Sequence, residues 1–208
     1  MTDSNGIVFV ISGPSGSGKG TVVSILKDIY PNVGVSVSAT SRLPRNGEID
    51  GEAYFFKTRE EFEALIAAGK MLEYNEYNGN YYGTLKSEAE RIVGEGKDLI
   101  LEIDVNGGAQ VRKLMGDKCV TIMLIAPDEE ELERRLRGRG TDSDEVIRGR
   151  LKRAGEEILL APEYDYITVN GSGDPLDCAE AILSIIRSEH LKSSRVSEYI
   201  GKHYFKKK

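Results

Sequence analysis

Apolar runs and polar breaks alternate along the chain in an order that predicts strands followed by helices. A continuous apolar run at 7–11 predicts a buried strand, and after a glycine-rich loop the apolar spacing at 21–30 predicts a helix that ends before Pro31. Further apolar strands are predicted at 99–105, 120–126 and 166–169. Strands that alternate with helices indicate an α/β fold with a parallel sheet and right-handed crossovers.

Helices are predicted behind each of the later strands. The stretch from Asn106 to Met115 follows the second strand, and apolar spacing around 178–186 follows the last. After the third strand, Asp128 is expected to cap a helix whose first turn, 129–131, is entirely glutamate. These helices would flank the sheet.

Residues 35–90 interrupt this regular order. A helix is predicted at 58–68, opened by a capping box between Thr58 and Glu61. Short strands are predicted beside it at 35–38, 54–56 and 71–77. We expect the stretch to form a small mixed insert folded against the main sheet.

Two further segments differ from the core pattern. Residues 138–149, rich in Gly, Arg and acidic residues, are expected to form a mobile flap or lid. The basic segment 193–208 is expected to be a frayed tail rather than a docking surface. The sequence therefore predicts one domain, with its core at about 1–34, 91–137 and 150–192.

Composition narrows the possible partners. The chain has 208 residues and a net charge of −6, which argues against binding nucleic acid through a basic face. It has no apolar run near the roughly 18 residues that span a membrane, and its first residues lack a secretory pattern, so we expect a cytoplasmic protein without membrane contact. Cys119 and Cys178, far apart in sequence, are expected to be reduced packing residues.

The loop at 13–19 fits the pattern G-x-x-x-x-G-K between a strand and a helix. Its backbone amides and the helix N-terminus would bind phosphate oxygens, and Lys19 would neutralise their charge. The next residue is Gly20, where a Ser or Thr hydroxyl commonly ligates a metal ion. Thr21, a water molecule or other groups would then have to hold magnesium.

Arginines outside the loop are candidates for phosphate contacts. Arg42 and Arg45 flank Pro44, which keeps them off a helix and lets both reach one phosphate, although two solvated surface arginines are an equal alternative. Arg134, Arg135 and Arg137 are predicted to pair with Glu130, Glu131 and Glu133 at i,i+4 spacing. Arg139 lies between two glycines outside such pairing, as a charge-stabilising residue on a closing flap would.

Five segments together give the chain a specific resemblance to a known family. They are GPSGSGK at 13–19, SVSATSRLPR at 36–45, GEIDGEAYFF at 47–56, GNYYGT at 79–84 and RLRGRGT at 135–141. The chain resembles guanylate kinases of the nucleoside monophosphate kinase superfamily as far as about residue 190. The resemblance implies a phosphate-loop kinase core, a GMP-binding insert and a lid, and transfer of phosphate from ATP to GMP in purine recycling with Mg²⁺ as cofactor.

The resemblance also implies roles for particular residues. ATP would be bound by Gly13, Pro14, Ser15, Gly16, Ser17, Gly18, Lys19, Gly20 and Thr21, with Asn170 and Gly171 near its adenine. Guanine would face Ser38, Glu73, Thr84 and Asp104, and the GMP phosphate would face Arg42, Arg45, Tyr54 and Tyr82, with Glu48 in the same GMP-binding segment. The catalytic residues would be Lys19, Arg45, Arg139 and Arg150. Thr21 and Glu102 would serve magnesium, directly or through water, although Asp104 is an alternative to Glu102.

Two other functions remain possible from the sequence. A guanylate-kinase-like domain without catalysis can act as a protein-binding module, but the intact phosphate loop and flap arginines argue against that class. A related kinase could phosphorylate a ribose bisphosphate, but such a substrate offers no guanine edge to Ser38, Glu73 and Thr84. The sequence leaves a monomer and a homodimer equally open.

Overall fold

A five-stranded parallel sheet forms the centre of the molecule. The computed structural model describes residues 6–138, 140, 142–171 and 173–204. The strands, in the spatial order β2-β7-β1-β8-β9, are β1 (Val8–Ser12), β2 (Val33–Val35), β7 (Asp98–Glu102), β8 (Cys119–Ile125) and β9 (Tyr166–Val169). Every neighbouring pair is parallel, as the alternating sequence pattern predicts.

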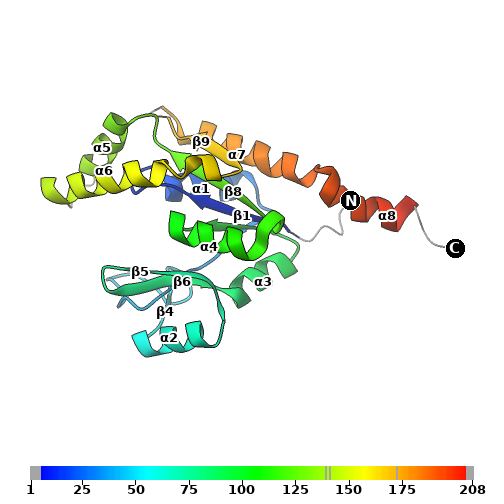
Figure 1. Cartoon of the computed structure of the whole chain (residues 1–208), viewed down its shortest axis with the longest axis horizontal. Coiled ribbons are helices and arrows are strands. Elements are labelled where there is room, and N and C mark those ends of the chain that lie inside the picture. Colours follow the sequence, from blue (N-terminus) through cyan, green and yellow to red (C-terminus); the bar gives the residue numbers. More distant parts are fainter. Residues whose placement is uncertain (1–5, 139, 141, 172, 205–208) are drawn as a thin grey trace.

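Helices cover both faces of this sheet (Figure 1). On one face, α1 (Lys19–Ile29) and α7 (Pro175–His190) bury Leu26 and Ile182 against Phe9. On the other, α3 (Lys86–Gly94) and α4 (Val105–Met115) bury Ile92 and Val111 against Leu99 and Leu101. Burial from both sides explains why the central strands are continuous apolar runs. Both cysteines are free and buried in these two clusters, as predicted.

Residues 39–85 form a second, smaller sheet with its own core. Its order is β4-β3-β6-β5, from β3 (Ala39–Thr40), β4 (Phe55–Phe56), β5 (Met71–Tyr77) and β6 (Asn80–Leu85). Helix α2 (Arg59–Ala67) lies on one side and buries Phe62 against Ala39 and Met71. The predicted capping box is present, with the Glu61 amide donating to the Thr58 hydroxyl.

Two helices and two short 3₁₀ turns complete the core. Helices α5 (Glu129–Gly138) and α6 (Asp144–Ile158) pack through Leu132, Leu136 and Ile147. Asp128 accepts from the Glu131 amide, which confirms the predicted cap of α5. The 3₁₀ turns η1 (Gly116–Lys118) and η2 (Ala161–Glu163) precede β8 and β9, respectively.

The structure corrects four details of the sequence interpretation. The strand predicted at 35–38 is absent from the insert, because β2 ends at Val35 and pairs with β7 of the core sheet. The strand predicted at 99–105 ends at Glu102, since Asp104 caps α4. Part of the predicted flap, from Asp144, is the start of α6, and the predicted frayed tail forms α8 (Ser193–Tyr204), which projects from the body (Figure 1).

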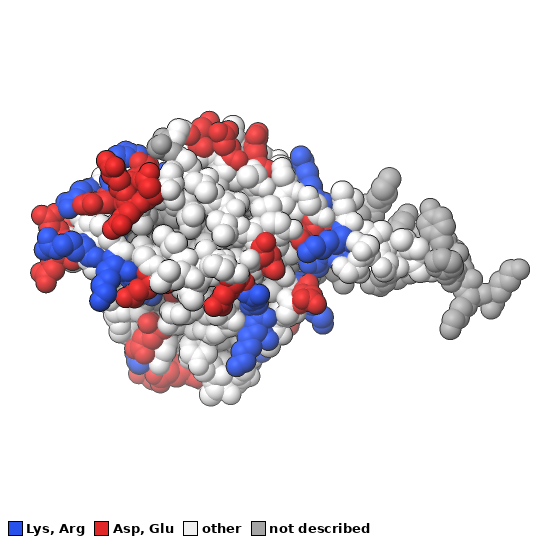
Figure 2. Space-filling model, turned by 45° about the horizontal axis from the view of Figure 1, so that its top comes forward, with Lys and Arg blue, Asp and Glu red and all other residues white. Residues whose placement is uncertain are grey.

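Charged side chains of both signs are mixed at one end of the molecule. On the face shown in Figure 2, basic and acidic side chains are interleaved at the end of the molecule that carries α5 and α6. Arg135 and Arg137 form the predicted pairs with Glu131 and Glu133, but Arg134 pairs with Glu131 at i,i+3 instead of with Glu130. None of the helices in the described ranges is both long and apolar enough to cross a membrane.

Candidate functional site

A cleft of about 670 Å³ opens between the carboxyl ends of the core strands and the small sheet. Ligands of open parallel sheets bind at this edge, where loops after the strands converge. The cleft brings together the predicted residues Gly13, Ser15, Gly16, Gly18, Lys19, Gly20, Thr21, Ser38, Tyr54, Glu73, Tyr82, Glu102, Asp104 and Arg150. Of the other predicted residues within the described ranges, Pro14, Ser17, Arg42, Arg45, Glu48, Thr84, Asn170 and Gly171 do not line it.

The phosphate loop joins β1 to α1 on the core side of the cleft. Gly18 precedes α1 at φ 92°, and no side chain caps the helix, so its first amides stay available to an anion. A Cβ at position 18 would stand 2.3 Å from the Asn170 amide nitrogen, so this position requires glycine for two reasons. The Lys19 ammonium donates to the carbonyls of Gly13 (2.5 Å) and Pro14 (3.1 Å), which curl the loop around it.

Oxygen donors surround the start of α1. A Cβ at Gly20 would lie 3.6 Å from the nearer carboxylate oxygen of Glu102, so Glu102 faces the position where a Ser or Thr side chain usually begins. Thr21 lines the same part of the cleft. No group of three or more His, Cys, Asp and Glu side chains suited to a metal ion occurs in the part of the chain that the structure describes.

A bulge in β5 sets which side chains face the cleft. The β5–β6 register shifts between Met71 and Glu73, so Met71 packs in the insert core while Leu72 packs against the core cluster of α3 and β7. Glu73 then also faces the core, beside Leu72 instead of opposite it. Bulges commonly re-aim a side chain in this way. From Glu73 onward, alternate residues of β5 line the cleft.

The carboxylate of Glu73 is almost completely buried. Its side chain accepts a hydrogen bond from the Thr84 hydroxyl at 2.8 Å, and Thr84 lies directly opposite on β6. Burial raises the pKa of Glu73 to about 7, with the Thr84 hydroxyl opposing this shift and the charge of Asp104 adding to it. A Cβ at Gly107 would stand 2.6 Å from this carboxylate, so α4 can approach Glu73 only because position 107 is glycine.

Asp104 is fixed by two donors at the start of α4. Its Oδ1 accepts from the Gly107 amide at 2.8 Å, and its Oδ2 accepts from the Asn75 side-chain amide at 2.6 Å. Glu73 and Asp104 therefore both lie close to Gly107 in the first turn of α4. Two acidic side chains at one end of the cleft are suited to a ligand edge that carries several hydrogen-bond donors.

The arginine loop after β3 lies on the insert side. Arg42 pairs with Glu48 at 2.9 Å, and its guanidinium lies over the Tyr54 ring at 5.4 Å from the centroid. Glu48 also accepts from the Arg45 backbone amide at 2.7 Å. Glu48 thus holds this loop together, while the Arg45 side chain is exposed to solvent.

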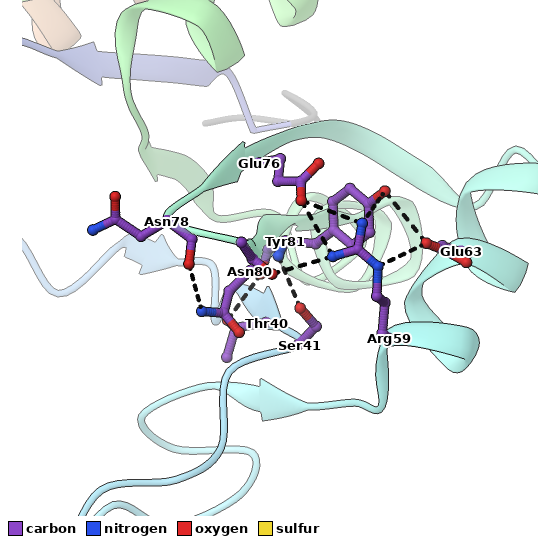
Figure 3. Close-up of polar contacts among 9 residues, drawn as sticks. Thr40, Ser41, Arg59, Glu63, Glu76, Asn78, Asn80 and Tyr81 are labelled. Atoms are coloured by element: carbon purple, nitrogen blue, oxygen red, sulfur yellow. Dashed lines mark hydrogen bonds and ion pairs between the residues drawn. The ribbon is translucent and has the colours of Figure 1, made fainter.

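A second arginine fastens the hairpin that carries the cleft residues. Arg59 of α2 reaches Glu76 and the carbonyl of Gly79 on the β5–β6 hairpin and lies 4.5 Å from the centroid of the Tyr81 ring (Figure 3). Tyr81 in turn stacks on Phe62. Its neighbour Tyr82, on the opposite face of β6, is thereby held toward the cleft.

Arg150 of α6 connects the flap to the phosphate loop. Its guanidinium donates to the Ser15 hydroxyl at 3.1 Å and pairs with Asp142 at 3.3 Å. This places a cation beside the loop that the sequence predicts to hold phosphate. The predicted catalytic residue Arg139 lies outside the described residues.

Arg135, which the sequence indicated only as a partner of Glu131, is a further functional candidate. Besides Glu131, its guanidinium reaches the carbonyls of Ser17, Asn170 and Gly171, all within 3.1 Å. The Asn170 amide also donates to the Ser17 carbonyl at 2.8 Å. Arg135 therefore ties the phosphate loop to the 170–171 loop, and no local sequence signal could have revealed this.

Several residues that line the cleft were not predicted from the sequence. Asn75 and Tyr77 line it from β5, and Arg153 and Glu157 line it from α6. Arg153 pairs with Glu157 at 2.9 Å and lies 5.4 Å from the centroid of the Tyr77 ring, across the cleft. The period of two along β5, counted from Glu73, was the signal that could have identified Asn75 and Tyr77.

Comparisons with known proteins agree on one family. The family model described as "Guanylate kinase" matches residues 6–189. A guanylate kinase of Lactococcus lactis is 50% identical over 193 residues, covering 93% of each chain, and one of Streptococcus thermophilus is 51% identical, covering 92% of this chain and 90% of its own. The crystal structure of guanylate kinase from Anaplasma phagocytophilum superimposes with a TM-score of 0.78 at 33% identity, covering all of both chains.

Proposed function

The chain belongs to the guanylate kinase family, and we propose on this basis that it transfers the γ-phosphoryl group of ATP to GMP, forming ADP and GDP. The observation that carries the proposal is a single cleft with a phosphate loop on one side and the Glu73–Thr84 pair on the other. Two nucleotides could lie in it end to end, with their phosphates meeting between the two sides.

The core side is suited to ATP. The free amides at the start of α1 and the ammonium of Lys19 can bind the β- and γ-phosphates. Asn170 and Gly171 lie next to this loop, joined to Ser17 through Arg135, and we assign them to the adenine. Ordering of both loops by one guanidinium would keep the donor nucleotide in a fixed orientation.

The insert side is suited to guanine. An ionised Glu73 can accept from N1–H and from the exocyclic amine of guanine, and Ser38 and Thr84 offer hydroxyls beside it. Adenine has a lone pair at N1 and no amine at C2, so it would leave these buried groups unpaired. This difference supports GMP as the acceptor and argues against a ribose bisphosphate.

Arginines and tyrosines supply the phosphate contacts between the two bases. We assign Tyr54, Tyr82 and Arg42 to the GMP phosphate, with Arg42 held in place by Glu48. The exposed Arg45 is assigned to the same phosphate and has to turn inward when the substrate binds. Arg150, already at the phosphate loop, would stabilise the charge that develops on the transferring group, together with Lys19 and Arg139.

Magnesium fits the oxygen donors at the start of α1. Thr21 and Glu102 are hard oxygen ligands beside the phosphate loop, and Mg²⁺ typically uses one or two such protein oxygens, with phosphates and water completing its shell. When bound, the ion would neutralise phosphate charge. The chain's own contribution is to orient the nucleotide phosphates and to exclude water from the closed cleft.

Purified protein given ATP, GMP and magnesium should form ADP and GDP in equal amounts, and chelation of the metal should reduce the rate by at least about a hundredfold because phosphate charge is then left unshielded. Quantification of all four nucleotides by chromatography measures both results. A protein that binds GMP but forms no GDP would instead support the silent binding module. Failure to bind GMP at all would contradict the proposal.

Binding of GMP should weaken as the pH falls below 7. Only the ionised form of Glu73 can accept from N1–H and the exocyclic amine of guanine together, and its pKa is about 7 in the free protein, so the KM for GMP should rise about tenfold per pH unit well below 7. The KM for ATP should change much less. Protonation of the GMP phosphate, with a pKa near 6, adds its own slope. The Glu73→Gln variant isolates that slope, and an equal pH dependence in both proteins would refute the assignment.

A further inference from the structure

Two side-chain amides join β5 of the insert to α4 of the core. The Gln110 amide donates to the Tyr74 carbonyl at 2.7 Å and its oxygen accepts from the Tyr74 amide at 3.2 Å. At the next residue, the Asn75 amide donates to Oδ2 of Asp104 at 2.6 Å. Of these three bonds, only the one from Asn75 involves a residue assigned to the guanine, whereas the two from Gln110 attach the backbone of β5.

Asn75 fixes the orientation of the Asp104 carboxylate. The Gly107 amide holds Oδ1 at 2.8 Å, and Asn75 holds Oδ2, so rotation about the last side-chain bond would break at least one of these bonds. The carboxylate needs a donor at Oδ2, which determines that the nitrogen of Asn75, rather than its oxygen, faces it. Each carboxylate oxygen keeps a second lone pair for a ligand.

The donor count of guanine requires an acceptor besides Glu73. Guanine presents three hydrogens on this edge, one at N1 and two on the amine at C2, and a single carboxylate accepts two of them side by side. Asp104 is the second acid at this end of the cleft, and both it and Glu73 lie close to Gly107. Its fixed carboxylate is therefore available to the remaining amine hydrogen.

We propose that Asn75 is a positioning residue for base selection: by holding Asp104 it sets the preference for a purine monophosphate with an amine at C2 over one without it. The inference rests on the proposed function, because it uses GMP as the acceptor. Asn75 lies across from Tyr82 in the β5–β6 register, between the base end and the phosphate end of the cleft. The side-chain amide of Asn75 acts on the base through Asp104, whereas the backbone of Asn75 is held in place by the β5–β6 hairpin.

The test compares GMP with IMP, which has hydrogen in place of the C2 amine. Asn75→Leu keeps the number and branching of the side-chain heavy atoms but removes the donor. The loss of a charge-assisted hydrogen bond should lower kcat/KM for GMP by about 10- to 100-fold. We expect less than about a threefold change for IMP and for the KM of ATP, since neither uses the second carboxylate. Asn75→Asp, which places two carboxylates together, should lower GMP use at least as much.

Asn80→Ala is the matched control. Asn80 is the same residue type on the same hairpin, but it lies outside the cleft lining and its amide donates to the Asn78 carbonyl at 3.2 Å. The GMP-to-IMP preference should be unchanged in this variant. Thermal unfolding of all variants establishes that they are folded, and Asn75→Ser, which keeps a shorter donor, should retain part of the preference if Asn75→Leu is unstable.

The possible outcomes separate the inference from the proposed function. A parallel loss with GMP and IMP in Asn75→Leu would mean that Asn75 only attaches β5, and this would overturn the inference alone. An unchanged preference in Asp104→Asn would overturn it together with the assignment of Asp104. Wild-type protein that binds neither monophosphate in calorimetry would overturn the proposed function, and the inference with it.

Discussion

Replacing Glu73 by Gln is expected to lower kcat/KM for GMP by about 10² to 10⁴, the result of losing two charge-assisted hydrogen bonds of about 1.5–3 kcal/mol each. Glutamine offers one acceptor and presents an NH₂ group to a base edge that itself consists of donors. Because the Glu73 carboxylate is buried and closely faced by Gly107, the new side chain has no space to turn away. Steady-state kinetics with GMP and AMP should show a much smaller preference for guanine.

A matched control lies on the same strand. Glu76 is exposed, on the opposite face of β5, and accepts from Arg59. Glu76→Gln retains an acceptor for Arg59, so GMP kinetics should stay within about threefold of wild type. If Glu73→Gln were equally mild, the guanine would have to bind elsewhere.

Replacing Lys19 by Met should lower the rate of phosphoryl transfer by about 10³, a loss typical of removing one preorganised charge from a transition state. The side chain keeps much of its length and apolar stem, so the change isolates the ammonium that lies against the Gly13 carbonyl. Single-turnover measurements separate the chemical step from product release. GMP binding, measured by calorimetry, should change little, because Glu73 and Thr84 lie on the other side of the cleft.

Lys27→Met provides the comparison for Lys19. Lys27 lies in the last turn of the same helix and is exposed, so its removal changes the net charge equally without touching the cleft. Its transfer rate should equal that of wild type within about twofold. A comparable loss in both variants would indicate that overall charge, rather than a contact with phosphate, governs the rate.

Local sequence signals were sufficient to predict most of the helices and strands. The strand at 166–169 was predicted with its observed bounds. The caps at Thr58 and Asp128 could be predicted, and were confirmed, since each forms between residues three positions apart in sequence. Errors arose where one residue could serve two elements. Ile103 and Val105 extend an apolar run, but Asp104 between them caps α4 and ends the strand.

In the candidate site too, features formed by neighbouring residues could be predicted from the sequence, and features formed by distant residues could not. The phosphate loop is contiguous, so its placement in the cleft followed from seven residues. The bond from Asn75 to Asp104 and the bonds from Arg135 to the 170–171 loop join residues that are between 29 and 36 positions apart in sequence. The periodicity of apolar residues gives no information about which distant segments come into contact. The likeness to guanylate kinases pointed to Glu73, but only the structure gives the burial that raises its pKa.

The bulge at Leu72 has a consequence for how acceptor choice could change during evolution. Because Leu72 and Glu73 face the same way only through that extra residue, a strand of the same sequence that paired regularly, without the bulge, would turn residues 73, 75 and 77 toward α2 without altering any of them. On the proposed assignment, base choice depends on which face of the strand these residues occupy as much as on their side-chain identity. An insertion or deletion between Glu73 and Tyr77, where no bulge absorbs the extra or missing residue, would then alter substrate range more abruptly than a substitution.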